Sequence, residues 1–101
     1  MGTGKFWKEL PEVGAAHAAF TNEVYKDGAL SGKVKRLIAL AVALRAWCTS
    51  CMTYQIKSAV EAGATKAEIL EATSVGFVMG GAPANAWMCS VVKTLEELGE
   101  W

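Results

Sequence analysis

The stretch that decides the fold is residues 33–51, KVKRLIALAVALRAWCTSC. Its centre, Leu37–Leu44, is apolar at every position, which is typical of a helix buried on all sides. The stretch ends in Cys48-Thr49-Ser50-Cys51, two cysteines three positions apart. Thiols at this spacing can close a disulfide with little backbone movement, and a helix that begins here would favour the thiolate through its free N–H groups and positive dipole end. The stretch therefore predicts a thiol–disulfide redox site on a helical scaffold.

Upstream of this stretch, residues 11–25 predict a first helix, with Pro11 in its first turn. Its apolar face has residues at steps of three and four, namely Leu10, Val13, His17, Phe20 and Val24. Because His17 is in phase with this face, we expect the only histidine of the chain to point inward. Ser31 is a suitable N-cap for the second helix, which we expect to run from residue 32 or 33 to about Trp47.

Downstream, three more helices are predicted. The third begins around Thr49 or Ser50, both good capping residues, and ends at residue 61 or 62, before Gly63. Residues 65–68, TKAE, form a capping-box signature that starts the fourth helix, which ends near residue 79. A fifth helix runs from about Pro83 to Leu98. No strand pattern, repeat or linker is present, so the sequence predicts a single all-α domain over residues 1–101, with about five helices.

The composition indicates association between copies of the chain. Residues of the AVILMFWYC set make up 52% of the 101 residues, a large apolar share for so short a chain. A small monomer cannot bury that much apolar surface, so we expect a homo-oligomer. Ten basic residues balance ten acidic ones, and the basic residues are scattered, which argues against a nucleic-acid partner.

Residues 72–92 carry no charge and are numerous enough to span a bilayer. However, Gly80-Gly81-Ala82-Pro83 interrupts them, so we expect two buried helices that meet at this corner and no membrane span. The segment of residues 1–12 is short, polar and mixed in charge, unlike a signal peptide. We therefore expect a cytoplasmic location. In a reducing compartment, a CxxC pair is more often catalytic or metal-binding than a structural staple.

Several blocks of the chain, in order, resemble the carboxymuconolactone decarboxylase family. They are Lys35–Leu44, Cys48–Cys51, Glu61–Thr65, Glu68–Ala72 and Met79–Ala84, within a match that covers about residues 10–95. The cysteine pair is most similar to that of the AhpD-like alkylhydroperoxidase branch. The resemblance implies an all-helical fold, a homo-oligomer that is commonly a trimer or hexamer, and an antioxidant dithiol. Such a dithiol would reduce peroxides or pass electrons between a lipoyl-type donor and a peroxiredoxin.

Two positions depart from the pattern of that family. The family has a Glu twelve residues before the first cysteine and a His four residues after the second, and together they relay protons to the second cysteine. Here these positions hold Arg36 and Gln55. Gln55 can form hydrogen bonds but cannot accept a proton near pH 7, and Arg36 cannot act as a base. Peroxide turnover by the usual relay is therefore in doubt, and the decarboxylase branch, which also needs the His, is disfavoured.

The remaining candidate residues have alternative interpretations. If Arg36 occupies the position of the family's Glu, it places a cation beside the dithiol and favours the thiolate; otherwise it is a solvated residue of the first helical turn. His17 could be a displaced base, but such a histidine is more often a core or interface residue. Tyr54 could donate a proton or pack on the helix surface. The resemblance assigns the attacking role to Cys51, whereas the helix-end argument favours Cys48.

A zinc site is the weakest of the alternatives. Cys48, Cys51, Cys89 and His17 would suffice for a Cys₃His set, but only the first two have ligand spacing, and Cys89 otherwise reads as a small buried apolar residue. The Gly80–Pro83 turn lacks the Lys and the Ser or Thr of a phosphate loop, and we expect no bound cofactor. Since both relay residues are missing, a non-enzymatic oligomeric scaffold or small-ligand binder remains the alternative to a thiol oxidoreductase.

Overall fold

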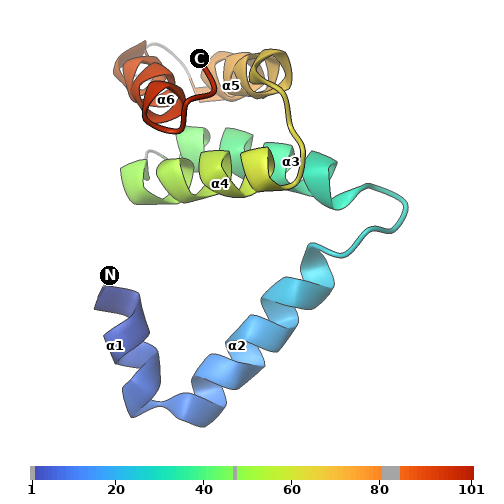
Figure 1. The fold of residues 1–101 in the computed structure, drawn as a ribbon, viewed down its shortest axis with the longest axis vertical. Coiled ribbons are helices and arrows are strands. Elements are labelled where there is room, and N and C mark those ends of the chain that lie inside the picture. Colours follow the sequence, from blue (N-terminus) through green and yellow to red (C-terminus); the bar gives the residue numbers. More distant parts are fainter. Residues whose placement is uncertain (1, 47, 81–84) are drawn as a thin grey trace.

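The computed structural model describes residues 2–46, 48–80 and 85–101, and within these residues the chain is all-helical (Figure 1). The helices are α1 (Gly2–Glu9), α2 (Pro11–Val24), α3 (Gly32–Arg45), α4 (Thr49–Glu61), α5 (Lys66–Gly80) and α6 (Asn85–Glu97). The all-α prediction is confirmed. The expected number of about five helices is too low, because α1 was not anticipated. Trp7 of α1 packs on α2 at Gly14, where an added Cβ would lie 3.1 Å from the Cβ of Trp7.

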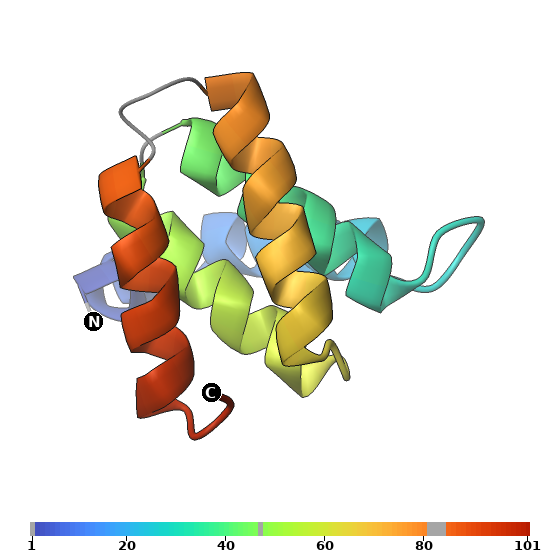
Figure 2. The same cartoon turned by 90° about the horizontal axis from the view of Figure 1, so that it is seen from above.

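Helices α3–α6 form two layers. Helices α3 and α4 lie side by side in one layer, and α5 and α6 cross over them in the other (Figures 1 and 2). Helix α5 packs mainly on α3, and α6 packs mainly on α4. The core between the layers consists of Leu40, Ala43, Leu44, Met52, Ile56, Ala59, Ala64, Ile69, Val91 and Leu95.

The two layers approach each other closely at Gly76 of α5. A Cβ at this position would lie 2.9 Å from both the Ala41 carbonyl oxygen and Leu44 Cδ2. Only glycine therefore lets α5 approach α3 this closely. Within the single chain α3 is not buried on all sides, because Val42 is 60% exposed, and the burial of its remaining surface by a partner subunit stays a prediction. Leu40, Ala43 and Leu44 are its buried residues, and the adjoining face, which includes Ile38 and Val42, lines the pocket described below.

Helices α1 and α2 form a hairpin that stands away from the two layers (Figure 1). The radius of gyration is 14.3 Å, larger than the value of about 13 Å for a compact chain of this length. Helix α2 has no buried residue, and Phe20 on its apolar face is 69% exposed. The prediction that His17 points inward is therefore wrong for the single chain. The periodicity of a helix defines its apolar face but does not say what covers that face.

The helix ends follow the local signals closely. Ser31 caps α3 by accepting a hydrogen bond from the Val34 N–H at 3.1 Å. Thr65 and Glu68 form the predicted capping box: Glu68 N–H donates to Thr65 Oγ1 and Thr65 N–H donates to Glu68 Oε1. The Thr65 N–H and the Lys33 ammonium both donate to the Glu68 carboxylate and lower its pKa. Gly63, with φ of +95°, ends α4 in the left-handed region as expected.

Two expectations fall on residues that the structure does not describe. They are the end of the second helix at Trp47 and the corner at Gly80–Pro83, of which only Gly80 is described. Helices α5 and α6 nevertheless separate the uncharged run of residues 72–92 into two elements, as predicted. Among the described helices, none is both long enough and apolar enough to cross a membrane.

Candidate active site

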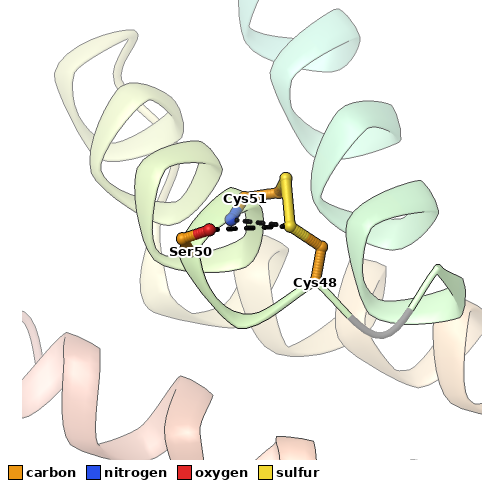
Figure 3. Close-up of a disulfide and its surroundings, with 3 residues drawn as sticks. All are labelled: Cys48, Ser50 and Cys51. Carbon is orange, nitrogen blue, oxygen red and sulfur yellow. Dashed lines mark hydrogen bonds between the residues drawn. A yellow bond between two sulfur atoms is a disulfide. The ribbon is translucent and has the colours of Figure 1, made fainter. Parts of the chain in front are cut away.

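The two cysteines lie at the N-terminus of α4 and are joined by a disulfide (Figure 3). Their Cα atoms are 5.2 Å apart. Helix α4 begins at Thr49, as predicted, but its N-cap is Cys48 and not one of the two expected capping residues: the Cys51 backbone N–H donates to Cys48 Sγ at 3.3 Å. Ser50 Oγ lies 3.7 Å from the same sulfur, and because a disulfide sulfur carries no hydrogen, the serine hydroxyl is the donor.

This arrangement treats the two sulfurs differently. Cys48 Sγ receives the N–H and hydroxyl donors at the positive end of α4, so the charge of a thiolate formed there would be stabilised. Cys48 is half-buried, whereas Cys51 is exposed. An incoming nucleophile can therefore reach Cys51 more readily, and the electron pair of the broken S–S bond is better held on Cys48.

The disulfide lies in the wall of a largely apolar pocket of about 580 Å³. The pocket follows the open face of α3, between the end of α2 and the first turns of α4. Its lining residues are Val24, Tyr25, Lys35, Ile38, Ala39, Val42, Ala43, Ala46, Cys48, Cys51 and Gln55. Apolar side chains along the pocket and two sulfurs at one end suit an organic substrate with an apolar body that reacts at sulfur or oxygen.

Arg36 does not line this pocket. Its guanidinium lies 3.5 Å from the centroid of the Tyr25 ring and donates to Gln55 Oε1 at 3.3 Å. The hypothesis that the Arg36 cation favours the thiolate stays a prediction, and the contact between Arg36 and the site that the structure shows is made through Gln55. Gln55 contacts Arg36 on one side and lines the dithiol pocket on the other.

Arg36 lines a second, smaller pocket of about 340 Å³. Tyr54 lines this second pocket and not the dithiol pocket, and its ring centroid lies 5.8 Å from the guanidinium carbon. Tyr54 is 56% exposed. Its position fits a surface residue that flanks Arg36 better than a proton donor to the cysteines.

His17 and Cys89 are not part of the candidate site. The His17 ring is exposed and stacks on Trp7, with centroids 5.0 Å apart. Cys89, expected to be buried, is an exposed free thiol on α6, because its neighbours Val91 and Leu95 face the core instead. In the described parts of the chain, no three His, Cys, Asp or Glu side chains are grouped closely enough to hold a metal ion. The Cys₃His zinc hypothesis therefore has no support in the fold.

Tyr25 and Lys35 were not predicted from the sequence to belong to the site. Tyr25 directly follows α2, and the Arg36 guanidinium stacks on its ring. Lys35 lines the dithiol pocket, and its ammonium donates to the Lys26 carbonyl at 2.6 Å. A signal for Lys35 exists, because residues 35, 38, 39, 42, 43 and 46 share one face of α3 at helical spacing. Nothing in the local sequence of Tyr25 indicates its partner, since the contact depends on the path of the loop before α3.

Comparisons with known proteins identify relatives of this chain by sequence and by fold. The sequence model described as "Carboxymuconolactone decarboxylase family" matches residues 11–94. A protein of Paracoccus denitrificans called "Uncharacterized protein 4 in cox locus" is 36% identical over 83 residues, which cover 82% of this chain and 75% of that protein. An uncharacterised protein of Cupriavidus necator is 29% identical over 95 residues, 94% of this chain and 84% of that protein.

Two crystal structures are also similar. One is an apo carboxymuconolactone decarboxylase family protein from Legionella pneumophila, with a TM-score of 0.86 and 34% identity over 93% of this chain and 84% of that chain. The other, from Thermotoga maritima, has a TM-score of 0.78 and 31% identity over 85% of this chain and 89% of that chain. Its description names the same family and suggests an involvement in antioxidative response.

Proposed function

The chain belongs to the carboxymuconolactone decarboxylase family, and we propose that it is an AhpD-like thiol–disulfide oxidoreductase that uses the Cys48–Cys51 pair. One observation carries the proposal: the two sulfurs are joined at a helix N-terminus, in the wall of a pocket that is open to a substrate. A purely structural disulfide would need neither the donors at Cys48 nor the exposure of Cys51.

In the reductive half of the cycle, an external organic dithiol supplies two electrons. Its thiolate attacks the exposed sulfur of Cys51, a mixed disulfide forms, and the electron pair of the broken S–S bond leaves on Cys48 Sγ, where the N–H of Cys51 stabilises it. The second thiol of the donor then displaces Cys51 and closes the donor's own disulfide. The protein is left with two reduced cysteines.

The oxidative half reverses these roles. Cys51 attacks a substrate disulfide and forms a mixed disulfide, and Cys48 then attacks Cys51, which restores the protein disulfide and releases the second substrate thiolate. With a peroxide, Cys51 would displace an alcohol and become a sulfenic acid, and Cys48 would release water from it. The displaced alkoxide needs a proton, and the position of the family's His is held by Gln55. We therefore propose that peroxide reduction is slower than disulfide exchange.

The test is a redox titration of the pair against dithiothreitol and glutathione buffers, followed by alkylation and mass spectrometry. We expect a reversible two-electron couple in which Cys48 and Cys51 change together, and faster reduction of a small disulfide than of an alkyl hydroperoxide by the dithiol form. If the two thiols react slowly and no disulfide forms under these buffers, the redox function is wrong, and the fold would serve as a scaffold or ligand binder.

We also propose that the chain functions as a homo-oligomer, a trimer or hexamer, in a reducing cytoplasm, with a lipoyl-type dithiol or a peroxiredoxin as redox partner. The support for oligomerisation is the exposed apolar surface on the hairpin and on α5, where Phe20 is 69% and Val78 is 77% exposed. These side chains are concentrated on one face of α2 and on the last turns of α5. Apolar patches of this kind mark protein–protein contacts in soluble proteins.

Phe20→Glu is expected to dissociate this assembly, because it places a charge in an apolar contact. Light scattering coupled to size exclusion would show a mass three or six times that of the chain for the wild type and a smaller one for the variant. Ala15→Glu, on the opposite face of α2, is the matched control and should leave the mass unchanged. A wild-type protein that is monomeric at micromolar concentration would contradict the proposal.

A further inference from the structure

We propose that Gln55 holds an amide N–H donor toward the sulfur of Cys51, and that Arg36 is the positioning residue that sets this orientation. The inference rests on the proposed redox function and deepens it. Arg36 and Gln55, which stand at the positions of the family's Glu and His, thereby have a role that needs no proton transfer. Three features of the structure carry it: the polarity of the Arg36–Gln55 hydrogen bond, the support of Arg36 by Tyr25, and the spacing of Gln55 and Cys51 on α4.

The hydrogen bond with Arg36 determines which end of the Gln55 amide faces the pocket. A guanidinium has only donors, so the atom of Gln55 that contacts it at 3.3 Å must be the carbonyl oxygen Oε1. The amide nitrogen Nε2 then lies on the other side of the group. Gln55 also lines the dithiol pocket, and from these two contacts we infer that its two N–H donors lie on the side away from Arg36.

Arg36 is itself held in place. Its guanidinium lies 3.5 Å from the centroid of the Tyr25 ring, close enough for a cation–π contact. Tyr25 is half-buried, and the loop that follows it is tied to α3, since the Lys35 ammonium donates to the Lys26 carbonyl at 2.6 Å. An arginine with fewer free rotamers fixes the amide of Gln55 at a lower cost in conformational entropy.

The helix geometry brings the amide close to Cys51. The two residues are four apart on α4, so their Cβ atoms are about 5–6 Å apart on one face. Helical side chains lean toward the N-terminus, which directs Gln55 toward Cys51 and not away from it. Both residues line the same pocket, which agrees with this direction.

Such a donor would act whenever Cys51 carries negative charge. When the mixed disulfide at Cys51 is broken, the electron pair goes to its sulfur, and the amide N–H stabilises the resulting thiolate while keeping its own proton. The family's histidine would take up a proton at this point, whereas Gln55 cannot. The pH dependence of Cys51 reactivity should therefore show a single rise, from the thiol of Cys51 itself.

The test measures iodoacetamide alkylation of each cysteine in the reduced protein as a function of pH, with mass spectrometry to separate the sites. In Gln55→Leu, we expect the midpoint for Cys51 to move upward by about one pH unit, the effect of losing one hydrogen bond to a charged group. The Cys51 rate below the midpoint should fall about threefold, because the thiolate fraction falls about tenfold while the more basic thiolate is about three times as nucleophilic. Cys48, held by its own donors, is the internal control, and Ser58→Ala, one turn further along α4, is the matched variant.

Gln55→Glu separates the donor from the contact with Arg36. The carboxylate can still accept from the guanidinium, but it offers no N–H and adds a negative charge near Cys51. We expect the Cys51 midpoint to move upward at least as far as in Gln55→Leu. A Cys51 profile that matches the wild type in both variants would overturn the inference.

Arg36→Met tests the positioning role. If Arg36 acts through Gln55, the Cys51 midpoint rises in Arg36→Met but not further when Arg36→Met is added to Gln55→Leu, so the two effects are non-additive. A direct effect of the arginine charge would instead add to that of Gln55→Leu and contradict the positioning role. The reversible couple of Cys48 and Cys51 should persist in all these variants. Its absence from the wild type would refute the proposed function itself, a result distinct from an unchanged Cys51 profile.

Discussion

Cys48→Ser and Cys51→Ser each abolish the reversible two-electron couple, because a disulfide within the chain needs both sulfurs. Turnover of a small disulfide substrate with dithiothreitol as the reductant should fall to the uncatalysed rate in both variants. Cys89→Ser is the matched control, since Cys89 is an exposed free thiol on α6, and it should retain full activity.

The two variants should differ in what accumulates. Without Cys48, the mixed disulfide between Cys51 and substrate has no resolving thiol, so Cys48→Ser should trap this adduct, which mass spectrometry would detect. Cys51→Ser should trap little, because the half-buried Cys48 is less accessible to substrate. The opposite pattern would exchange the two roles, and the absence of an adduct in both variants would contradict the dithiol mechanism.

Loss of activity in these variants should not reflect unfolding. Cys48 is the N-cap of α4, and serine is among the best N-cap residues, so Cys48→Ser keeps the cap. Cys51 is exposed and is not one of the core residues. Thermal unfolding should be compared under reducing conditions, so that the stabilisation by the disulfide itself does not enter the comparison.

Leu44→Ala is expected to destabilise the fold strongly. Leu44 is 1% exposed and lies between α3 and α5, where its side chain covers Gly76. Removing it deletes buried methyl groups and leaves a cavity that the close α3–α5 crossing cannot easily fill. The loss of unfolding free energy should be about 3 kcal/mol, within the range for buried Leu→Ala changes.

Urea unfolding of the reduced protein, monitored by circular dichroism, would measure this loss as a lower midpoint with little change in slope. Leu30→Ala is the matched control, because it makes the same chemical change at an exposed residue between α2 and α3 and should cost well under 1 kcal/mol. Equal effects of the two substitutions would mean that the α3–α5 contact is not the centre of the core.

Much of the fold can be predicted from short segments of the chain. Ser31, Gly63 and the pair Thr65 and Glu68 determine where helices begin or end through hydrogen bonds and backbone angles within a few residues. The cysteine pair has the same local character, since a separation of three residues at a helix start suffices to bring the sulfurs together. The order of the sequence blocks between Lys35 and Ala84 also indicates the family, which the comparisons confirm.

Other features required the tertiary structure. The periodicity of the sequence predicted that His17 and Phe20 share an apolar face of α2. It did not predict that α2 stands away from the core and leaves that face exposed. The capping role of Cys48 was also missed, because Thr49 and Ser50 are stronger capping residues by type. Cys48, directly before α4, takes that position with an extended backbone, φ −105° and ψ 98°.

The sequence by itself predicted helices α2–α6, the cysteine pair and the departure from the family's Glu and His at Arg36 and Gln55, because each depends on residue type or on contacts within one helical turn. Only the tertiary structure showed that Arg36, Gln55 and Tyr25 come together. Arg36, Gln55 and Tyr25 lie on or beside three different helices, and their contacts depend on how α2, the following loop and α4 pack around α3. Contacts between distant segments are set by the packing of whole helix faces, for which a single residue pattern carries no signal.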